Sequence, residues 1–311
     1  MLVEVVRAFA ASEGIPLWGT TTAVPLEPEG ERLAEWLARG LHGGLSYLTA
    51  TAALRSDPTR SDVLRAGAQG VVLLGLPFAR TTPDTPAAER AAASYLRGRN
   101  YHRVFRGVLR RLAGRLREAV PDLAVRPFCD VLPVLEKALA VRAGLGWQGR
   151  NTLVIHPEAG STFVLGGLLL DRPLPSAVPL APACGDCRRC IDACPTGALA
   201  LPGVLDAGRC LSRWSTAGLP PPPALPHGPY ARGCDVCQDV CPFNAGPGLA
   251  PYVGFYQRST SVPGKNATST GGDSSPASGA DSPPPKSAEK SVKKNRTVPA
   301  TSAAPVRPRK T

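Results

Sequence analysis

The chain has 311 residues, of which 43% are hydrophobic, enough for one well-sized core and a smaller attached unit. No apolar run reaches the length of a membrane span, and the N-terminal stretch carries Glu4 and Arg7 in an amphipathic pattern, so we exclude a signal peptide and expect a soluble, cytoplasmic protein. The net charge is +12, but residues 251–311 hold ten Lys/Arg against three Asp/Glu and carry +7 of it, so a basic, nucleic-acid-like composition is mainly a property of this segment.

The first part of the chain, residues 1–182, alternates helical and strand patterns. Apolar residues recur at three- and four-residue spacing in 2–12, 29–41 and 101–120, which predicts amphipathic helices. Continuous or alternating apolar runs predict strands in 14–21, 70–78, 123–129, 151–156 and 161–170, with a hairpin-like connection between the last two. Strands interleaved with helices indicate an α/β-type or α+β sheet domain.

The acidic residue Asp130 follows the predicted strand 123–129 directly. Asp130 precedes Pro133 at a strand-to-loop edge, where functional sites are often built. Its neighbours are apolar, and such surroundings raise the pKa of a carboxyl and let it donate a proton near neutral pH. A solvated loop aspartate or a helix cap is the open alternative. Glu136 falls in the first turn of the next helix, where a carboxylate suits the helix dipole, and we assign it a structural role.

The second part, residues 183–250, holds eight of the nine cysteines. The run CGDCRRCIDACP has the C-x2-C-x2-C-x3-C-P spacing of bacterial ferredoxins, in which the cysteine before the proline ligates the other cluster. The later run GCDVCQDVCP is one cysteine short of this pattern, and Cys210 supplies the eighth ligand. The pattern therefore predicts two [4Fe–4S] clusters, one on Cys184, Cys187, Cys190 and Cys241, and one on Cys194, Cys210, Cys234 and Cys237.

Two alternatives accompany this interpretation. Paired zinc sites also use sets of four cysteines, although zinc ribbons rarely show this spacing. Cys129 lies outside the set and is expected to be a small buried hydrophobic residue.

The third part, residues 251–311, is rich in Ser, Pro, Thr, Lys and Gly and has almost no large apolar residues after Tyr256. Such a segment cannot bury enough surface to offset its chain entropy, so it is predicted to be a disordered tail. Its basic runs KSVKKNR and VRPRK could contact RNA or another anionic surface, and a solvated tail is the simpler alternative.

Seven stretches together resemble the epoxyqueuosine reductases, cobalamin-dependent enzymes of queuosine synthesis in tRNA. These are LHGGLSYL, GRNYHRVFRGVLRRL, RPFCDVLPVLEKALAVRAGLGWQGRNTLVI, EAGSTFVLGGLLLD, CGDCRRCIDACPTGAL, RCLS and GCDVCQDVCPFN. The resemblance covers about Leu2 to Asn244. It implies that a base-off cobalamin on the N-terminal domain takes electrons from the clusters and that epoxyqueuosine in tRNA is reduced to queuosine, with release of water.

The resemblance also assigns residues and partners. Asp130 matches the proton donor of the family and lies beside the cofactor. The cobalamin contacts that it implies are Asn151, Val154 and Leu165, with Ser212 and Asp235 as weaker candidates. The implied partners are tRNA carrying epoxyqueuosine and an external electron donor of the flavodoxin or ferredoxin type, and the chain is expected to be a monomer.

The chain departs from the family pattern in three places. Thr49–Thr51 stand where the family usually has a cobalamin-contacting arginine, which Arg55 could replace, and Asn100 stands for an acid. A low-complexity tail follows CPFN, where the family usually continues into a C-terminal helical repeat domain. A frameshift, a truncated gene and a genuine replacement by a basic tail are the open explanations. Two other functions stay open at this point: a ferredoxin-type electron carrier without cobalamin, and a cobalamin enzyme similar to the reductive dehalogenases.

Overall fold

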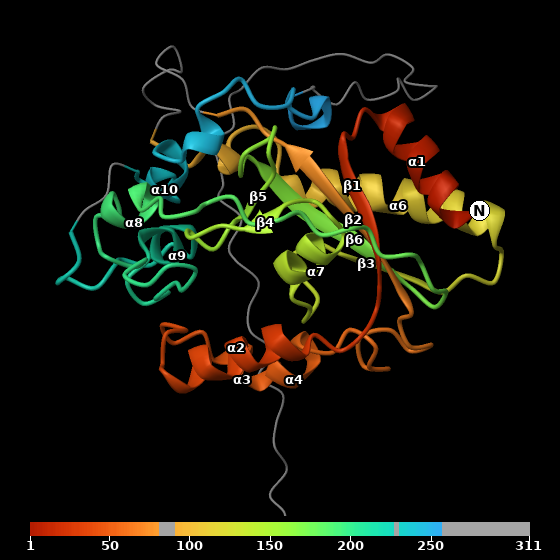
Figure 1. The fold of residues 1–311 in the computed structure, drawn as a ribbon, viewed down its shortest axis with the longest axis horizontal. Coiled ribbons are helices and arrows are strands. Elements are labelled where there is room, and N and C mark those ends of the chain that lie inside the picture. The colour runs from red at the N-terminus through yellow and green to blue at the C-terminus, as the bar shows by residue number, and fades with distance from the viewer. Residues whose placement is uncertain (81–90, 227–229, 257–311) are drawn as a thin grey trace, which may run out of the picture. The chain divides into compact units, whose positions relative to one another are not determined.

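The computed structural model describes residues 1–80, 91–226 and 230–256 (Figure 1), all within one compact unit, Met1–Ser259. From residue 257 onward, the segment predicted to be a disordered basic tail lies outside the described residues. No helix in the described ranges is long and apolar enough to cross a membrane.

A four-stranded antiparallel sheet forms the centre of the unit. Its strand order is β1 (Leu17–Thr22), β2 (Gly70–Pro77), β6 (Phe163–Leu170) and β3 (Val125–Phe128). The long apolar runs of β2 and β6 pair along their whole length, from Gly70 opposite Leu170 to Pro77 opposite Phe163. β2 is buried at every position because both faces of the sheet are covered. The predicted mixed helix and sheet fold is therefore confirmed.

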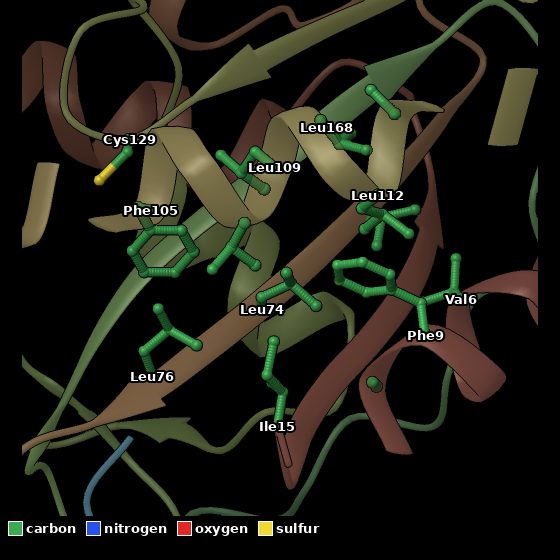
Figure 2. Close-up of a cluster of buried hydrophobic side chains, with 14 of the residues drawn as sticks. Val6, Phe9, Ile15, Leu74, Leu76, Phe105, Leu109, Leu112, Cys129 and Leu168 are labelled. Atoms are coloured by element: carbon green, nitrogen blue, oxygen red, sulfur yellow. The ribbon is translucent and has the colours of Figure 1, made fainter. Parts of the chain in front are cut away.

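One face of the sheet packs against helices α1 (Leu2–Glu13) and α6 (Tyr101–Ala119). Figure 2 shows Phe105, Leu109 and Leu112 of α6 pointing toward Leu74 and Leu76 of β2. The sheet has no side chain at Gly166 of β6, where a Cβ would lie 2.7 Å from the Phe105 ring. This glycine therefore lets the helix approach the strand closely.

The other face packs against α7 (Glu136–Arg142), whose Leu139 and Ala140 are fully buried against β1 and β2 residues. Three further helices, α2 (Glu27–Ala38), α3 (Ser46–Ala50) and α4 (Ala52–Arg55), lie together at the lower edge of Figure 1. None of the residues in these three helices is buried, although Leu54 of α4 packs against the core cluster on this face.

The segment 151–156 was expected to form a hairpin with the strand that follows it. Instead, β5 (Val154–Ile155) pairs with β4 (Trp147–Gln148) in a separate two-stranded sheet. An isolated bridge between His156 and Gly160 closes the connection to β6. The glycine-rich segment before β5 offered a nearer partner strand, which the apolar pattern alone did not reveal.

The helices described in the cysteine-rich part are short: α8 (Arg189–Asp192), α9 (Leu211–Thr216) and α10 (Val236–Asp239). The 3-10 turns η1 (Ser94–Leu96), η2 (Pro242–Asn244) and η3 (Val253–Phe255) complete the described helical elements. Asn244 fastens this part to the start of β6. Its Oδ1 accepts a hydrogen bond from Ser161 N at 2.8 Å, and its Nδ2 donates to Ser161 Oγ at 3.0 Å and to Gln238 O at 2.8 Å.

The folded region extends beyond the predicted boundary at residue 250. Tyr252 and Phe255 are 6% and 3% exposed and join the core between the sheet and α6. Residues 251–256, assigned to the disordered tail from composition, are therefore folded. These two aromatic rings supply the apolar surface that the rest of the tail lacks.

Candidate functional site

A cavity of about 1050 Å³ opens at the end of the sheet where β2 and β3 finish and β6 begins. It exceeds the upper end of the size range usual for small-molecule sites, about 300–1000 Å³. Side chains from α2, α4, the start of α7, the β4–β5 turn and the cysteine-rich part line it. The cavity therefore has room for a ligand as large as a macrocyclic cofactor.

Hydrogen bonds fix the α2 layer against the cysteine-rich part and so close one side of this cavity. Trp36 Nε1 donates to Leu205 O at 2.6 Å, and Ala207 N donates to Leu41 O at 2.8 Å. Two segments far apart in the sequence thus form one wall.

The eight predicted cluster cysteines fall into two groups in space. The first cysteine group surrounds a small cavity of about 20 Å³ and consists of Cys184, Cys187, Cys190 and Cys241. The second cysteine group lines the large cavity and consists of Cys194, Cys210, Cys234 and Cys237. These are the two sets that the ferredoxin spacing predicts, including the exchange of Cys194 and Cys241 between the groups.

Burial raises the pKa values of five of these thiols, those of Cys190, Cys210, Cys234, Cys237 and Cys241. In the first group, burial and then the charge of Cys241 raise the pKa of Cys190. In the second group, burial raises the pKa of Cys234 to about 11, while the backbone N–H of Val236 opposes this shift. Because iron binds thiolates, cluster assembly would release the protons that these thiols hold.

Asp130 lies at the mouth of the large cavity in a left-handed backbone conformation with φ of 61°. Tyr101 O–H donates to its Oδ2 at 2.5 Å, and His102 Nδ1 lies 3.8 Å from the same oxygen. Its own backbone N–H donates to Glu136 Oε1 at 2.6 Å. Tyr101 thus holds the side chain of Asp130, and the Glu136 carboxyl group holds its backbone.

The prediction that apolar side chains surround the Asp130 carboxyl is wrong. Its side chain is 52% exposed, and the neighbouring Val131 points into solvent. The apolar residues around it in the sequence turn away, because the positive φ at Asp130 reverses the chain there. Cys129, by contrast, is buried as expected.

Glu136 is a half-buried carboxyl of the site, although the sequence suggested only a structural role at a helix start. Burial, followed by the charge of Asp130, raises the pKa of Glu136 to about 8, and Arg55 partly opposes the shift. Its position next to Leu135, Ala138 and Leu139 was the signal in the sequence that this turn faces the protein interior.

The glycine-rich turn places Asn151 in the wall of the cavity. The side chain is 4% exposed, and its Oδ1 accepts a hydrogen bond from Leu153 N at 3.2 Å. Its Nδ2 has no hydrogen-bond partner among the described residues. Thr152 follows with φ of 67°, and Lys137 Nζ donates to its carbonyl at 2.9 Å, which holds the turn in place.

Of the other predicted cofactor contacts, Val154, Leu165 and Ser212 line the same cavity. Asp235 does not. It is 2% exposed, and its carboxylate accepts hydrogen bonds from Ser94 N at 2.6 Å and from Gln238 Nε2 at 3.1 Å. Asp235 is adjacent to Cys234 in the sequence, but its side chain connects the cysteine-rich part to the segment around Ser94.

Arg55 supplies a cation to the cavity near Thr49–Thr51. Its Nε donates to Thr51 Oγ1 at 2.9 Å, and its guanidinium lies 5.6 Å from the centre of the Tyr47 ring. Arg55, like Tyr47, lines the cavity. The sequence raised Arg55 as a substitute for the arginine missing from this segment, and the fold brings it to the cavity wall.

Comparison with known proteins separates the chain into two matched regions. Residues 183–244 match the family described as "4Fe-4S double cluster binding domain". Residues 55–131 match the family described as "Epoxyqueuosine reductase QueG, DUF1730". The first match agrees with the two cysteine groups and supports a pair of [4Fe–4S] clusters rather than zinc.

Curated relatives extend the similarity over most of the chain. The epoxyqueuosine reductase of Alicycliphilus denitrificans is 38% identical over 257 residues, which are 78% of this chain and 70% of the relative. The chain belongs to the epoxyqueuosine reductase family. That of Leadbetterella byssophila is 36% identical over 77% of this chain and 79% of the relative. As a member of this family the chain is an oxidoreductase, as the sequence predicted.

Solved epoxyqueuosine reductase structures share this fold. A complex with an epoxyqueuosine-modified tRNA-Tyr stem loop has a TM-score of 0.70 and 29% identity, covering 80% of this chain and 68% of that chain. The Bacillus subtilis enzyme has a TM-score of 0.68 and 29% identity, covering 80% of this chain and 67% of that chain. In that structure the loop with a catalytic aspartate has swung out of the active site.

Proposed function

We propose that this chain reduces epoxyqueuosine to queuosine in tRNA, using cobalamin and two [4Fe–4S] clusters held by the first and second cysteine groups. One observation carries the proposal. The second cysteine group and the Asp130–Glu136–Tyr101 cluster line the same cavity of about 1050 Å³. A proton donor and a source of single electrons therefore face one ligand space.

The cavity wall fits cobalamin in three respects. Its volume suits a corrin macrocycle, its β4–β5 turn presents the unpartnered Nδ2 of Asn151, and apolar side chains surround that turn. The cofactor would be held by Asn151, Val154, Leu165 and Ser212, and Arg55 lines the same cavity. When bound, cobalamin would supply a low-potential cobalt centre that passes electrons from the clusters to the substrate.

Asp130 would donate the proton that the reaction requires. Conversion of the epoxide to the alkene consumes two electrons and two protons and releases the oxygen as water. The Asp130 carboxyl, half exposed at the cavity mouth, can reach a substrate that enters from solvent. The aspartate-bearing catalytic loop of the Bacillus subtilis enzyme supports this role for the corresponding loop here.

Glu136 and Tyr101 would position Asp130 and set its proton supply. Tyr101 O–H donates to the Asp130 carboxylate and so holds this side chain at the cavity. Glu136 accepts from the Asp130 backbone N–H and, with a pKa raised to about 8 by burial and by Asp130, holds a proton at neutral pH. The site can therefore keep a proton close to the donor between turnovers.

The substrate would be tRNA carrying epoxyqueuosine, as in the solved complex of a relative with a modified stem loop. An external carrier of the flavodoxin or ferredoxin type would supply the electrons. We further propose that the chain acts as a monomer in the cytoplasm.

The experiment is an anaerobic reconstitution of the full chain followed by a turnover assay. We expect cobalamin to bind, with a change in its absorption spectrum, and queuosine to form in an epoxyqueuosine-containing stem loop, detected by mass spectrometry of the nucleosides. Clusters without cobalamin binding would instead indicate an electron carrier. Cobalamin binding without queuosine formation would contradict the proposed substrate.

A further inference from the structure

Some arginines of helix α6 form ion pairs or hydrogen bonds within the protein, and others do not. The helix carries six arginines, and three of them are bonded within the protein. Arg111 pairs with Glu13 at 2.6 Å, Arg115 pairs with Glu118 at 3.2 Å, and Arg117 donates to two backbone carbonyls at 3.4 and 3.5 Å. These three contribute to the stability of the helix and of its contacts.

The other three arginines, Arg103, Arg106 and Arg110, are exposed and have no acidic or hydrogen-bonding side-chain partner among the described residues. They lie at positions i, i+3 and i+7, so they form one stripe along the helix. The stripe is about 10 Å long, which corresponds to the rise of about three nucleotides along one strand.

Two glycines lie on the same side of the helix as this stripe. Gly107 and Gly114 each follow a stripe arginine by four residues. A Cβ at Gly114 would meet nothing within 4 Å, and one at Gly107 would meet only the end of the Arg111 side chain at 3.6 Å. Neither glycine is required by packing, although each costs the helix about 1 kcal/mol relative to alanine.

The stripe begins beside the proposed catalytic residues. Tyr101, which donates to Asp130, and His102 occupy the first turn of the same helix, directly before Arg103. Figure 2 shows the opposite side of α6, where Phe105, Leu109 and Leu112 pack on the sheet. The stripe therefore faces away from the core, and a strand lying along it would lead toward the Asp130 loop.

We propose that the exposed side of α6, defined by Arg103, Arg106, Arg110, Gly107 and Gly114, binds the phosphate backbone of the RNA substrate. The proposal rests on the proposed function, and it places an RNA contact on the folded unit itself. Guanidinium groups suit phosphates because their donors form a planar fork, and the missing side chains at the glycines allow a bulky backbone to approach the helix.

The test is a salt titration of binding, using the full chain and a tRNA anticodon stem loop. The variant replaces Arg103, Arg106 and Arg110 with Gln. We expect its affinity at low salt to fall on the order of tenfold or more and the slope of log K against log salt to decrease by about 2–3. The control replaces Arg7, Arg60 and Arg115 with Gln, which removes the same charge from arginines paired with Glu4, Asp62 and Glu118.

A second variant tests the glycine contact without changing charge. Gly114→Leu should fold, since its Cβ points into open space, yet it should weaken stem-loop binding several-fold, whereas Gly114→Ala should bind nearly as well as the wild type. Equal slopes for the stripe variant and the control would overturn the proposal. If the stripe variant binds heparin or acidic vesicles more weakly but binds the stem loop as the wild type does, the proposal is overturned in favour of another anionic partner.

The proposal can fail separately from the proposed function. If the stripe variant keeps normal stem-loop affinity and normal turnover, the α6 surface is wrong and the enzyme activity stands. If the wild-type chain neither binds nor reduces the stem loop, both the activity and the surface fail.

Discussion

The backbone N–H of Asp130 donates to Glu136 Oε1 at 2.6 Å, so a half-buried carboxyl fixes the main chain of the exposed one. Asp130 holds φ of 61°, a conformation that costs a non-glycine residue about 1–2 kcal/mol. The hydrogen bond from Asp130 N and the one from Tyr101 O–H offset this cost. The geometry of the proposed proton donor thus depends on Glu136.

Replacing Glu136 with Ala should release the Asp130 loop. We expect kcat to fall on the order of a hundredfold, the scale of a misplaced catalytic group, while stem-loop affinity stays near the wild-type value. Glu136→Gln keeps an acceptor oxygen for Asp130 N–H but loses the stored proton, so it should lower kcat by less than the Ala change does. Hydrogen exchange at the Asp130 amide should become faster in the Ala variant alone. Equal exchange and equal kcat in all three proteins would contradict a positioning role.

Glu136 should also make stability depend on pH. Its pKa is raised from 4.5 to about 8 on folding, so between these values the folded state holds a proton that the unfolded state has lost. Stability should therefore fall as pH rises through this window, by at most about 1.4 kcal/mol per pH unit from this group. Urea unfolding of wild type and Glu136→Gln should diverge toward pH 8, with the Gln variant the more stable. If the stabilities of the two proteins change with pH in parallel, a group other than Glu136 causes the pH dependence.

Asp130→Asn should separate proton transfer from binding. The amide keeps the size of the side chain and can still hydrogen-bond with Tyr101, but it does not readily give up a proton. Turnover should fall on the order of a hundredfold or more, with cobalamin and iron content unchanged. Near-normal turnover with both cofactors intact would show that the proton comes from another group, such as His102 or a water.

The sequence predicted best those elements whose pattern lies within one short stretch of the chain. Helix α6 follows from apolar residues at three- and four-residue spacing, and strands β2 and β6 follow from long apolar runs. The partition of the cysteines follows from chemistry, because a cysteine before proline ligates the distant cluster of a ferredoxin pair. Each of these patterns is complete within a short stretch of chain.

The features that sequence missed depend on distant parts of the fold. Asp130 is exposed because its own φ turns the chain outward, and Glu136 is half-buried because α7 packs against β1 and β2. Asp235 is adjacent to a cysteine, yet its carboxylate points toward Ser94, which is far away in the sequence. The residues next to them in the sequence do not include the distant segments that determine how exposed these side chains are.

Cys210 is the predicted ligand with the least sequence support, since it belongs to neither run of cysteines. Cys210→Ala should lower the iron content after reconstitution from about eight to about four per chain, because one of two [4Fe–4S] clusters loses a ligand. Cys129→Ala is the matched control, since Cys129 is buried outside both groups. Eight iron atoms in the Cys210 variant, or a loss in the Cys129 variant, would contradict the assignment.

Asn151 tests whether the large cavity binds cobalamin. Its Nδ2 is a buried donor without a partner, and leaving such a group unsatisfied costs about 1–3 kcal/mol, which a bound ligand with an acceptor would recover. Asn151→Asp keeps the oxygen that accepts from Leu153 N but removes the donor, and Asn151→Ala removes both. Cobalamin affinity, measured by absorbance titration, should fall on the order of tenfold in each. Asn100→Ala, which removes only the N-cap of α6, should bind normally. Unchanged affinity in both Asn151 variants would place the cofactor away from the β4–β5 turn.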